Sequence, residues 1–183
     1  ALLDSTGMLA CGEDLGMIPA TVPQVMDDLR ILSLEIQRMP KSVEETFAHP
    51  ANYPYLSVCT TSTHDMNPIR AWWEEDRQVT NDFWQMILGN QGEAPYFCEP
   101  WICRQILEQH VWSPAMLTIL PLQDWLSMDA QLRREDPNAE RINVPANSRH
   151  YWRYRMHLTL EQLAAADEFN QALTDMIAAS GRC

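Results

Sequence analysis

Three short apolar runs of this sequence are each followed directly by ionisable or polar side chains. These side chains are Glu13 and Asp14 after one run, His64 and Asp65 after another, and Gln123 and Asp124 after the last. If the runs are parallel β-strands, their carboxyl ends lie at one edge of a sheet, where ligands bind in parallel α/β folds. A carboxylate after a strand also commonly caps the next helix, so each residue alone has a structural explanation. The repetition at matching positions favours a ligand site.

The composition indicates which ligands to expect. The chain has 183 residues, enough for one ordinary domain, with 13 Lys plus Arg against 25 Asp plus Glu, a net charge of -12. Such a field repels nucleic acid and anionic membrane surfaces, so neither is an expected partner. The 7 Trp and 5 Tyr beside many carboxylates suit a neutral polyhydroxylated ligand. The alternative is an aromatic core with solvated acidic faces.

The elements that would position these loops alternate between strands and helices. Apolar residues after Thr21 repeat at helical spacing, and Thr21 with Gln24 matches a capping box. Thr159 with Gln162 has the same pattern at the start of a long final helix, which should run to Gly181. We expect strands over 8–11, 31–39, 56–61 and 115–122, and further helices over 70–76, 81–88 and 99–109. This order predicts an α/β fold with a parallel sheet.

Cysteine and histidine spacing indicates neither a disulfide framework nor a metal site. The 5 Cys, from Cys11 to Cys183, are scattered, and the 5 His show no ligand spacing, so we expect no metal and no cofactor. No apolar run approaches the roughly 20 residues of a membrane-spanning helix, and no signal peptide opens the chain. These features predict a cytoplasmic location. Because Ala1 stands where Met would, we expect the chain to begin partway through something longer.

Several motifs in order resemble the later part of a 4-α-glucanotransferase of the amylomaltase and disproportionating-enzyme family. They cover residues 11–19, 61–65 with the Trp72–Trp73 pair, 120–124, 141–145 and 151–155. The runs over 61–76 and 149–155 resemble most the maltose-using disproportionating branch. The resemblance extends from about Leu9 to about Arg155.

This resemblance implies the second half, strands five to eight, of a (β/α)8 TIM barrel closed by a C-terminal helix. Residues 1–183 would then be a single partial domain, the C-terminal half of a catalytic barrel. The family acts by a retaining double displacement, transferring α-1,4-glucan segments or glucosyl units between maltose, maltodextrin and glycogen-like acceptors. α-1,4-Glucans and maltose are therefore the implied partners.

The family's catalytic roles can be carried over to matching positions. Glu13 matches the general acid/base, and Asp65 matches the group that stabilises the transition state, with His64 beside it as a ligand of sugar hydroxyls. A partly desolvated Glu could stay protonated near neutral pH, deliver its proton to the leaving group and then deprotonate the acceptor. An ionised Asp suits the developing oxocarbenium charge.

Substrate contacts can be carried over in the same way, each with a structural alternative. Trp72 and Trp73 could stack on a glucose ring, or they could belong to the core. Gln123 and Asp124 could line the cleft, or Asp124 could cap its helix. The motif that contains Arg141 and Asn143 lies near the donor and acceptor sites in the family, although a network that stabilises the loop would use the same residues.

One catalytic residue of the family has no match. The nucleophile is an Asp in an Arg-x-Asp-His motif well before the acid/base, yet only 12 residues precede Glu13, and Asp4 has the wrong neighbours. The chain alone should therefore be inactive. A barrel divided in this way has two open sheet edges, so we also expect self-association. Two other functions stay open: a non-catalytic α-glucan-binding or scaffold domain, and an α-glucan hydrolase of the same clan.

Overall fold

A computed structural model describes residues 3–16 and 18–182 of the chain. Ala1, Met17 and Cys183, which entered the sequence analysis, lie outside the described residues. The chain forms two compact units. The first contains the residues up to Thr60 together with Ser113–Ile119, and the second contains Thr61–Trp112 together with the residues from Leu120 onward.

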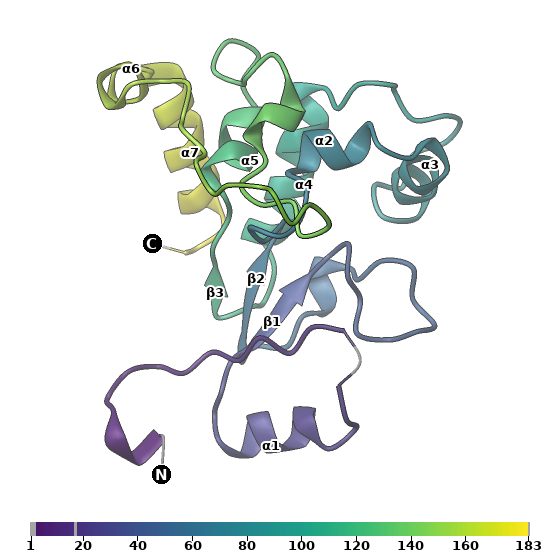
Figure 1. Cartoon of the computed structure of the whole chain (residues 1–183), viewed down its shortest axis with the longest axis vertical. Coiled ribbons are helices and arrows are strands. Elements are labelled where there is room, and N and C mark those ends of the chain that lie inside the picture. Colours follow the sequence, from purple (N-terminus) through teal and green to yellow (C-terminus); the bar gives the residue numbers. More distant parts are fainter. Residues whose placement is uncertain (1–2, 17, 183) are drawn as a thin grey trace. The chain divides into compact units, whose positions relative to one another are not determined.

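The first unit is built on a small parallel sheet (Figure 1). Its strands are β1 (Ser33–Ile36), β2 (Ser57–Thr60) and β3 (Leu117–Thr118), in the spatial order β1-β2-β3. Cys11 adds a single parallel bridge to Leu32, just before β1. All four residues of β2 are buried, as expected for a central strand of a parallel sheet. The unit also holds η1 (Leu3–Ser5), α1 (Val22–Asp28) and η2 (Pro50–Asn52).

The second unit consists of helices and long connections (Figure 1). Its helices are α2 (Ile69–Trp73), α3 (Arg77–Met86), α4 (Pro100–Val111), α5 (Leu122–Ser127), η3 (Pro137–Glu140), α6 (Leu160–Ala164) and α7 (Asp167–Ala179). α4 packs against α5 and α7, and α2 packs against α5 and η3. Ile102, Leu107 and Leu126 are completely buried in this unit. No helix of the described residues is long and apolar enough to cross a membrane.

Most predicted elements are present, but three details of the prediction are wrong. The first predicted strand, over 8–11, is reduced to the bridge at Cys11. The Thr21 side chain makes no capping hydrogen bond, because its backbone is already helical at φ -81° and ψ -18°. Gln24 instead donates to Asp28 at 2.8 Å.

The final helix is the third difference, because it is divided into α6 and α7. The capping box of Thr159 and Gln162 at the start of α6 is confirmed. The chain leaves helical geometry at Ala166, where ψ is 66°. The Asn170 side chain donates to the carbonyl of Leu163 at 3.0 Å, so a carbonyl at the end of α6 keeps a partner.

Candidate active site

The loop between β2 and α2 carries two of the predicted site residues, His64 and Asp65. Both side chains are about half exposed, and His64 Nε2 lies 3.5 Å from Asp65 Oδ1. Asn143 joins them from a distant part of the chain: its Nδ2 donates to Asp65 Oδ1 at 2.6 Å, and its backbone N–H donates to the His64 carbonyl at 3.1 Å. Asp65 therefore presents a carboxylate that is oriented by an amide and still open to a ligand.

Asn143 is itself held by the neighbouring arginine. Arg141 Nε donates to the Asn143 carbonyl at 2.9 Å, and Asn143 Oδ1 accepts from the backbone N–H of Val144 at 2.9 Å. The network that stabilises the loop is therefore present, and a place near the donor and acceptor sites stays a prediction. The motif also brings Asn143 to Asp65.

Asp124 fixes both ends of the loop that carries Asp65. It is completely buried, and its carboxylate accepts from Thr61 Oγ1 at 2.5 Å, Ser62 Oγ at 2.9 Å and the backbone N–H of Ile69 at 2.8 Å. The sequence left open whether Asp124 lines the cleft or caps its own helix. In the structure it lies inside α5 and binds the first N–H of α2, where the N-cap residue Pro68 offers no side-chain acceptor.

A small pocket of about 60 Å³ lies between His64, Gln123 and Glu140. Gln123 is buried, and its Nε2 donates to the backbone carbonyl of Glu140 at 3.3 Å. Glu140 is also buried, and among the described residues neither of its carboxylate oxygens has a hydrogen bond of good geometry. Burial raises the pKa of Glu140 to about 7, with Arg70 acting in the opposite direction. Sequence reasoning missed this residue, since nothing local signals that it is buried.

The tryptophans have different environments. Trp73 is completely buried, its indole N–H donates to the Pro95 carbonyl at 3.0 Å, and its ring packs edge to face with Phe83. Trp73 therefore belongs to the core, the second of the two alternatives, because a buried ring cannot stack on a sugar. Trp72 is half-buried against Phe83. Trp152, which the sequence analysis did not select, is 61% exposed with its ring centroid 4.9 Å from that of His64.

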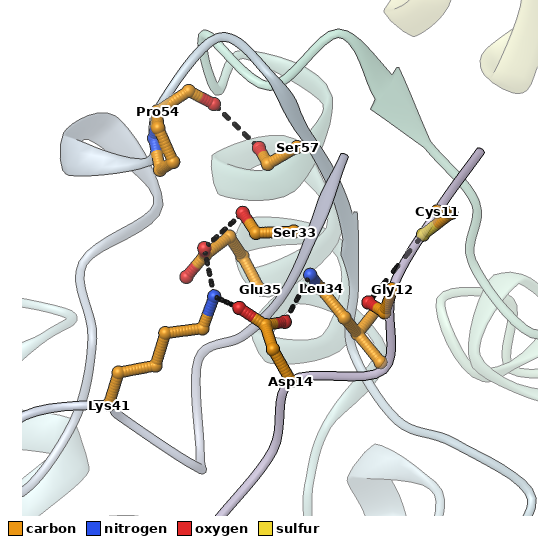
Figure 2. A network of polar contacts seen from close by, with 9 residues as sticks. All are labelled: Cys11, Gly12, Asp14, Ser33, Leu34, Glu35, Lys41, Pro54 and Ser57. Carbon is orange, nitrogen blue, oxygen red and sulfur yellow. Dashed lines mark hydrogen bonds and ion pairs between the residues drawn. The ribbon is translucent and has the colours of Figure 1, made fainter. Parts of the chain in front are cut away.

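Glu13 lies in the first unit. Its neighbour Asp14 joins this segment to Leu34 of β1 (Figure 2). Asp14 is buried and accepts from the Leu34 backbone N–H at 2.8 Å and from Lys41 Nζ at 2.6 Å. Lys41 also bonds Glu35 at 2.6 Å. Glu13 itself is exposed and makes no hydrogen bond or ion pair to the described residues. These residues thus fix its backbone but do not supply the desolvation that a protonated acid needs.

The structure therefore brings His64, Asp65 and Asn143 together. Arg141 and Asp124 support them, and Gln123 lines the small pocket beside His64. A parallel sheet whose strand ends lead into loops rich in carboxylates is the arrangement of an α/β enzyme. Trp152 could have been found from its place in the 151–155 motif. Glu140 had no such signal.

Comparison with known proteins gives the class. The chain matches the 4-alpha-glucanotransferase family over residues 2–160, and it belongs to that family. It is 42% identical to the 4-alpha-glucanotransferase DPE2 of Oryza sativa subsp. japonica over 99% of its length, and 32% identical to the enzyme of Chlamydia muridarum over 96%. It spans 19% and 33% of these two relatives.

Two solved structures are also similar in fold. The amylomaltase from Streptococcus agalactiae in complex with acarbose superposes with a TM-score of 0.70 at 19% identity, over 99% of this chain and 34% of that one. The amylomaltase from Corynebacterium glutamicum gives a TM-score of 0.60 at 17% identity. Both similarities concern the fold.

Proposed function

We propose that this chain contributes one half of the catalytic barrel of a retaining 4-α-glucanotransferase acting on α-1,4-glucans, with maltose among its substrates. The contact between Asp65 and Asn143 at 2.6 Å is the observation that carries the proposal. It joins two motifs that resemble the family, 78 residues apart, at one exposed carboxylate. The parallel order of the Cys11 bridge, β1, β2 and β3 suits strands five to eight of a barrel.

In this proposal Asp65 stabilises positive charge as the sugar flattens. A carboxylate held by an amide keeps one oxygen oriented without a shift in position during the reaction, which is how preorganised groups stabilise transition states. His64, 3.5 Å away, can donate to a sugar hydroxyl. The exposed Trp152 ring beside His64 offers an apolar face to a glucose unit.

Glu13 acts as the general acid and then as the general base. It is exposed and bound to nothing in the described residues, so substrate or the rest of the protein must supply its desolvation. The nucleophile comes from a part of the protein outside this sequence, since no Asp of the chain stands in the expected motif. The chain alone therefore does not transfer glycosyl groups.

The test joins the chain to the preceding segment of its parent protein and supplies maltose or maltotriose. Glucose and longer maltodextrins should form, and Glu13→Gln should lower their rate of formation about 10²- to 10⁴-fold. Glu44→Gln is the matched control, because Glu44 is an exposed carboxylate in another loop of the same unit. It should retain full activity.

Two results would overturn the proposal. Turnover retained in the Glu13→Gln variant would mean that another group is the acid. Glucose released from maltose by the 183-residue chain alone would mean that its nucleophile is present after all. The ratio of maltodextrin to free glucose separates transfer from hydrolysis, because water as acceptor gives no longer product.

A further inference from the structure

The second unit has an open pocket of about 440 Å³ whose charged lining is entirely basic. It lies between the segments 134–142 and 147–155. We call it the arginine pocket after the side chains that line it, Arg134, Arg141, Arg149, Arg153 and Arg155. No Asp or Glu is among its lining residues. Five of the 13 basic residues of a chain with net charge -12 thus gather at one place.

None of these arginines forms an ion pair within the described residues, although the charge of Arg134 acts to lower the pKa of Glu140. In the part of the chain that the structure describes, no carboxylate lies within ion-pair distance of any of the five, and the side-chain hydrogen bonds of Arg134 and Arg141 go to backbone carbonyls. Arg134 Nη1 donates to the Arg155 carbonyl at 3.4 Å, and Arg141 uses its Nε for Asn143. The nearby Glu140 lines the separate small pocket beside His64. Since a guanidinium stays charged at any physiological pH, the arginine pocket keeps its positive field.

The remaining lining is suited to a small ligand with a ring. Tyr151 and Tyr154 line the pocket with Asn147, and the Arg153 guanidinium carbon lies 5.5 Å from the centre of the Tyr151 ring. Aromatic faces bind the C–H faces of sugars, and the volume falls within the usual range for small-molecule sites. We propose that the arginine pocket binds a sugar phosphate, with the guanidinium groups on the phosphate ester and the tyrosines beside the sugar.

The lining of the arginine pocket suits a small phosphate ester better than a nucleic acid. A phosphate monoester carries up to two negative charges and three acceptor oxygens, which match the paired N–H donors of several guanidinium groups. Nucleic acid would need an extended basic surface, yet only eight Lys and Arg lie outside the pocket against 25 Asp and Glu in the chain. The basic side chains are therefore concentrated in the pocket and do not form an extended surface. The site does not depend on the catalytic roles proposed above.

Isothermal titration with glucose 6-phosphate, inorganic phosphate and glucose tests the proposal. Arg149→Gln with Arg153→Gln is the informative variant, because both side chains are exposed and their loss leaves the core intact. Arg30→Gln with Arg104→Gln makes the same charge change on exposed arginines outside the pocket. Glucose 6-phosphate should bind most tightly, and the pocket variant should weaken it by about tenfold or more, with the control unchanged. Raising the salt concentration should weaken binding.

Several outcomes would contradict the proposal. Absence of glucose 6-phosphate binding at millimolar concentration, or equal binding by the pocket variant and the parent chain, would overturn the site. Equal affinity for inorganic phosphate would overturn the assignment to a sugar ester. The titration is repeated on the longest form of the protein that can be purified. Loss of binding there would show that carboxylates of that protein occupy the pocket, and would overturn the proposal as well.

Discussion

At the scale of single residues, two carboxylates of the second unit differ in their exposure to solvent. Asp65 is about half exposed and accepts a hydrogen bond from Asn143, so its carboxylate is oriented and open to a ligand. Glu140 is buried, and burial raises its pKa to about 7, with the charge of Arg70 acting in the opposite direction. The same functional group thus has opposite environments at two positions of the second unit.

Glu140 should make stability depend on pH. Its folded-state pKa of about 7 exceeds its ordinary value of 4.5, so the folded protein holds the proton more tightly and stability falls as pH rises from about 4.5 to about 7. Glu140→Gln mimics the protonated acid and removes this loss. Relative to wild type, the free energy of unfolding of the variant should increase by about 2 kcal/mol between pH 5 and pH 8. Urea unfolding at the two pH values measures the difference.

Other charged groups around Glu140 define the control. Arg70, Asp124, Arg134 and Tyr154 interact with it, and none of these residue types titrates between pH 5 and pH 8 in ordinary surroundings. His64 lines the same pocket, so His64→Gln is measured in parallel. If His64→Gln abolishes the pH dependence and Glu140→Gln does not, the imidazole is the titrating group.

At the scale of elements, α5 holds the loop that carries Asp65. Asp124, inside α5, binds the hydroxyls of Thr61 and Ser62 at the start of the loop and the Ile69 N–H at its end. A buried carboxylate with three donors fixes both ends of this loop. The position of Asp65 is therefore set by a helix that follows a different strand.

Asp124→Ala should destabilise the second unit by about 2 to 4 kcal/mol, because two buried hydroxyls and one helix N–H lose their acceptor. Thermal or urea unfolding measures the change. Thr61→Val removes a single donor and should cost about 1 kcal/mol. Asp28→Ala is the control, since Asp28 is exposed and accepts a hydrogen bond from the exposed side chain of Gln24. A cost for Asp124→Ala no larger than that of the control would show that the carboxylate does not hold the loop.

At the scale of the whole molecule, the sheet of the first unit has two edges with exposed apolar residues. Met8 and Leu9 precede the Cys11 bridge at one edge, and Leu117 and Ile119 lie at β3 on the other. Leu9 is 57% exposed and Ile119 61%. Unpaired strands with apolar side chains pair readily with other chains.

We therefore expect the 21.1 kDa chain to elute as a species larger than a monomer in size-exclusion chromatography with light scattering. Leu9→Lys with Ile119→Lys should shift it toward the monomer, since charged side chains on edge strands oppose pairing. Val43→Lys, at an exposed position in the connection between β1 and β2, should leave the mass unchanged. A monomer at all concentrations contradicts the expectation.

The agreement between sequence and structure differs from residue to residue. The helix of Pro100–Val111 and the strand of Ser57–Thr60 follow from apolar patterning, because that signal is local. The capping box at Thr21 failed where that at Thr159 formed, because a cap depends on one residue's backbone angles. The roles of Glu13 and Asp65 stay predictions that rest on the family motifs.

The order of residues along the chain determined the parallel α/β class, the family and the loops that carry the carboxylates, because motifs and hydrophobic period are written in short segments. Only the tertiary structure decided that Trp73 and Asp124 are buried, that Asn143 contacts Asp65, and that five arginines share one pocket. Burial and charge clustering depend on contacts between segments that lie far apart in the sequence. They arise only when the chain has folded.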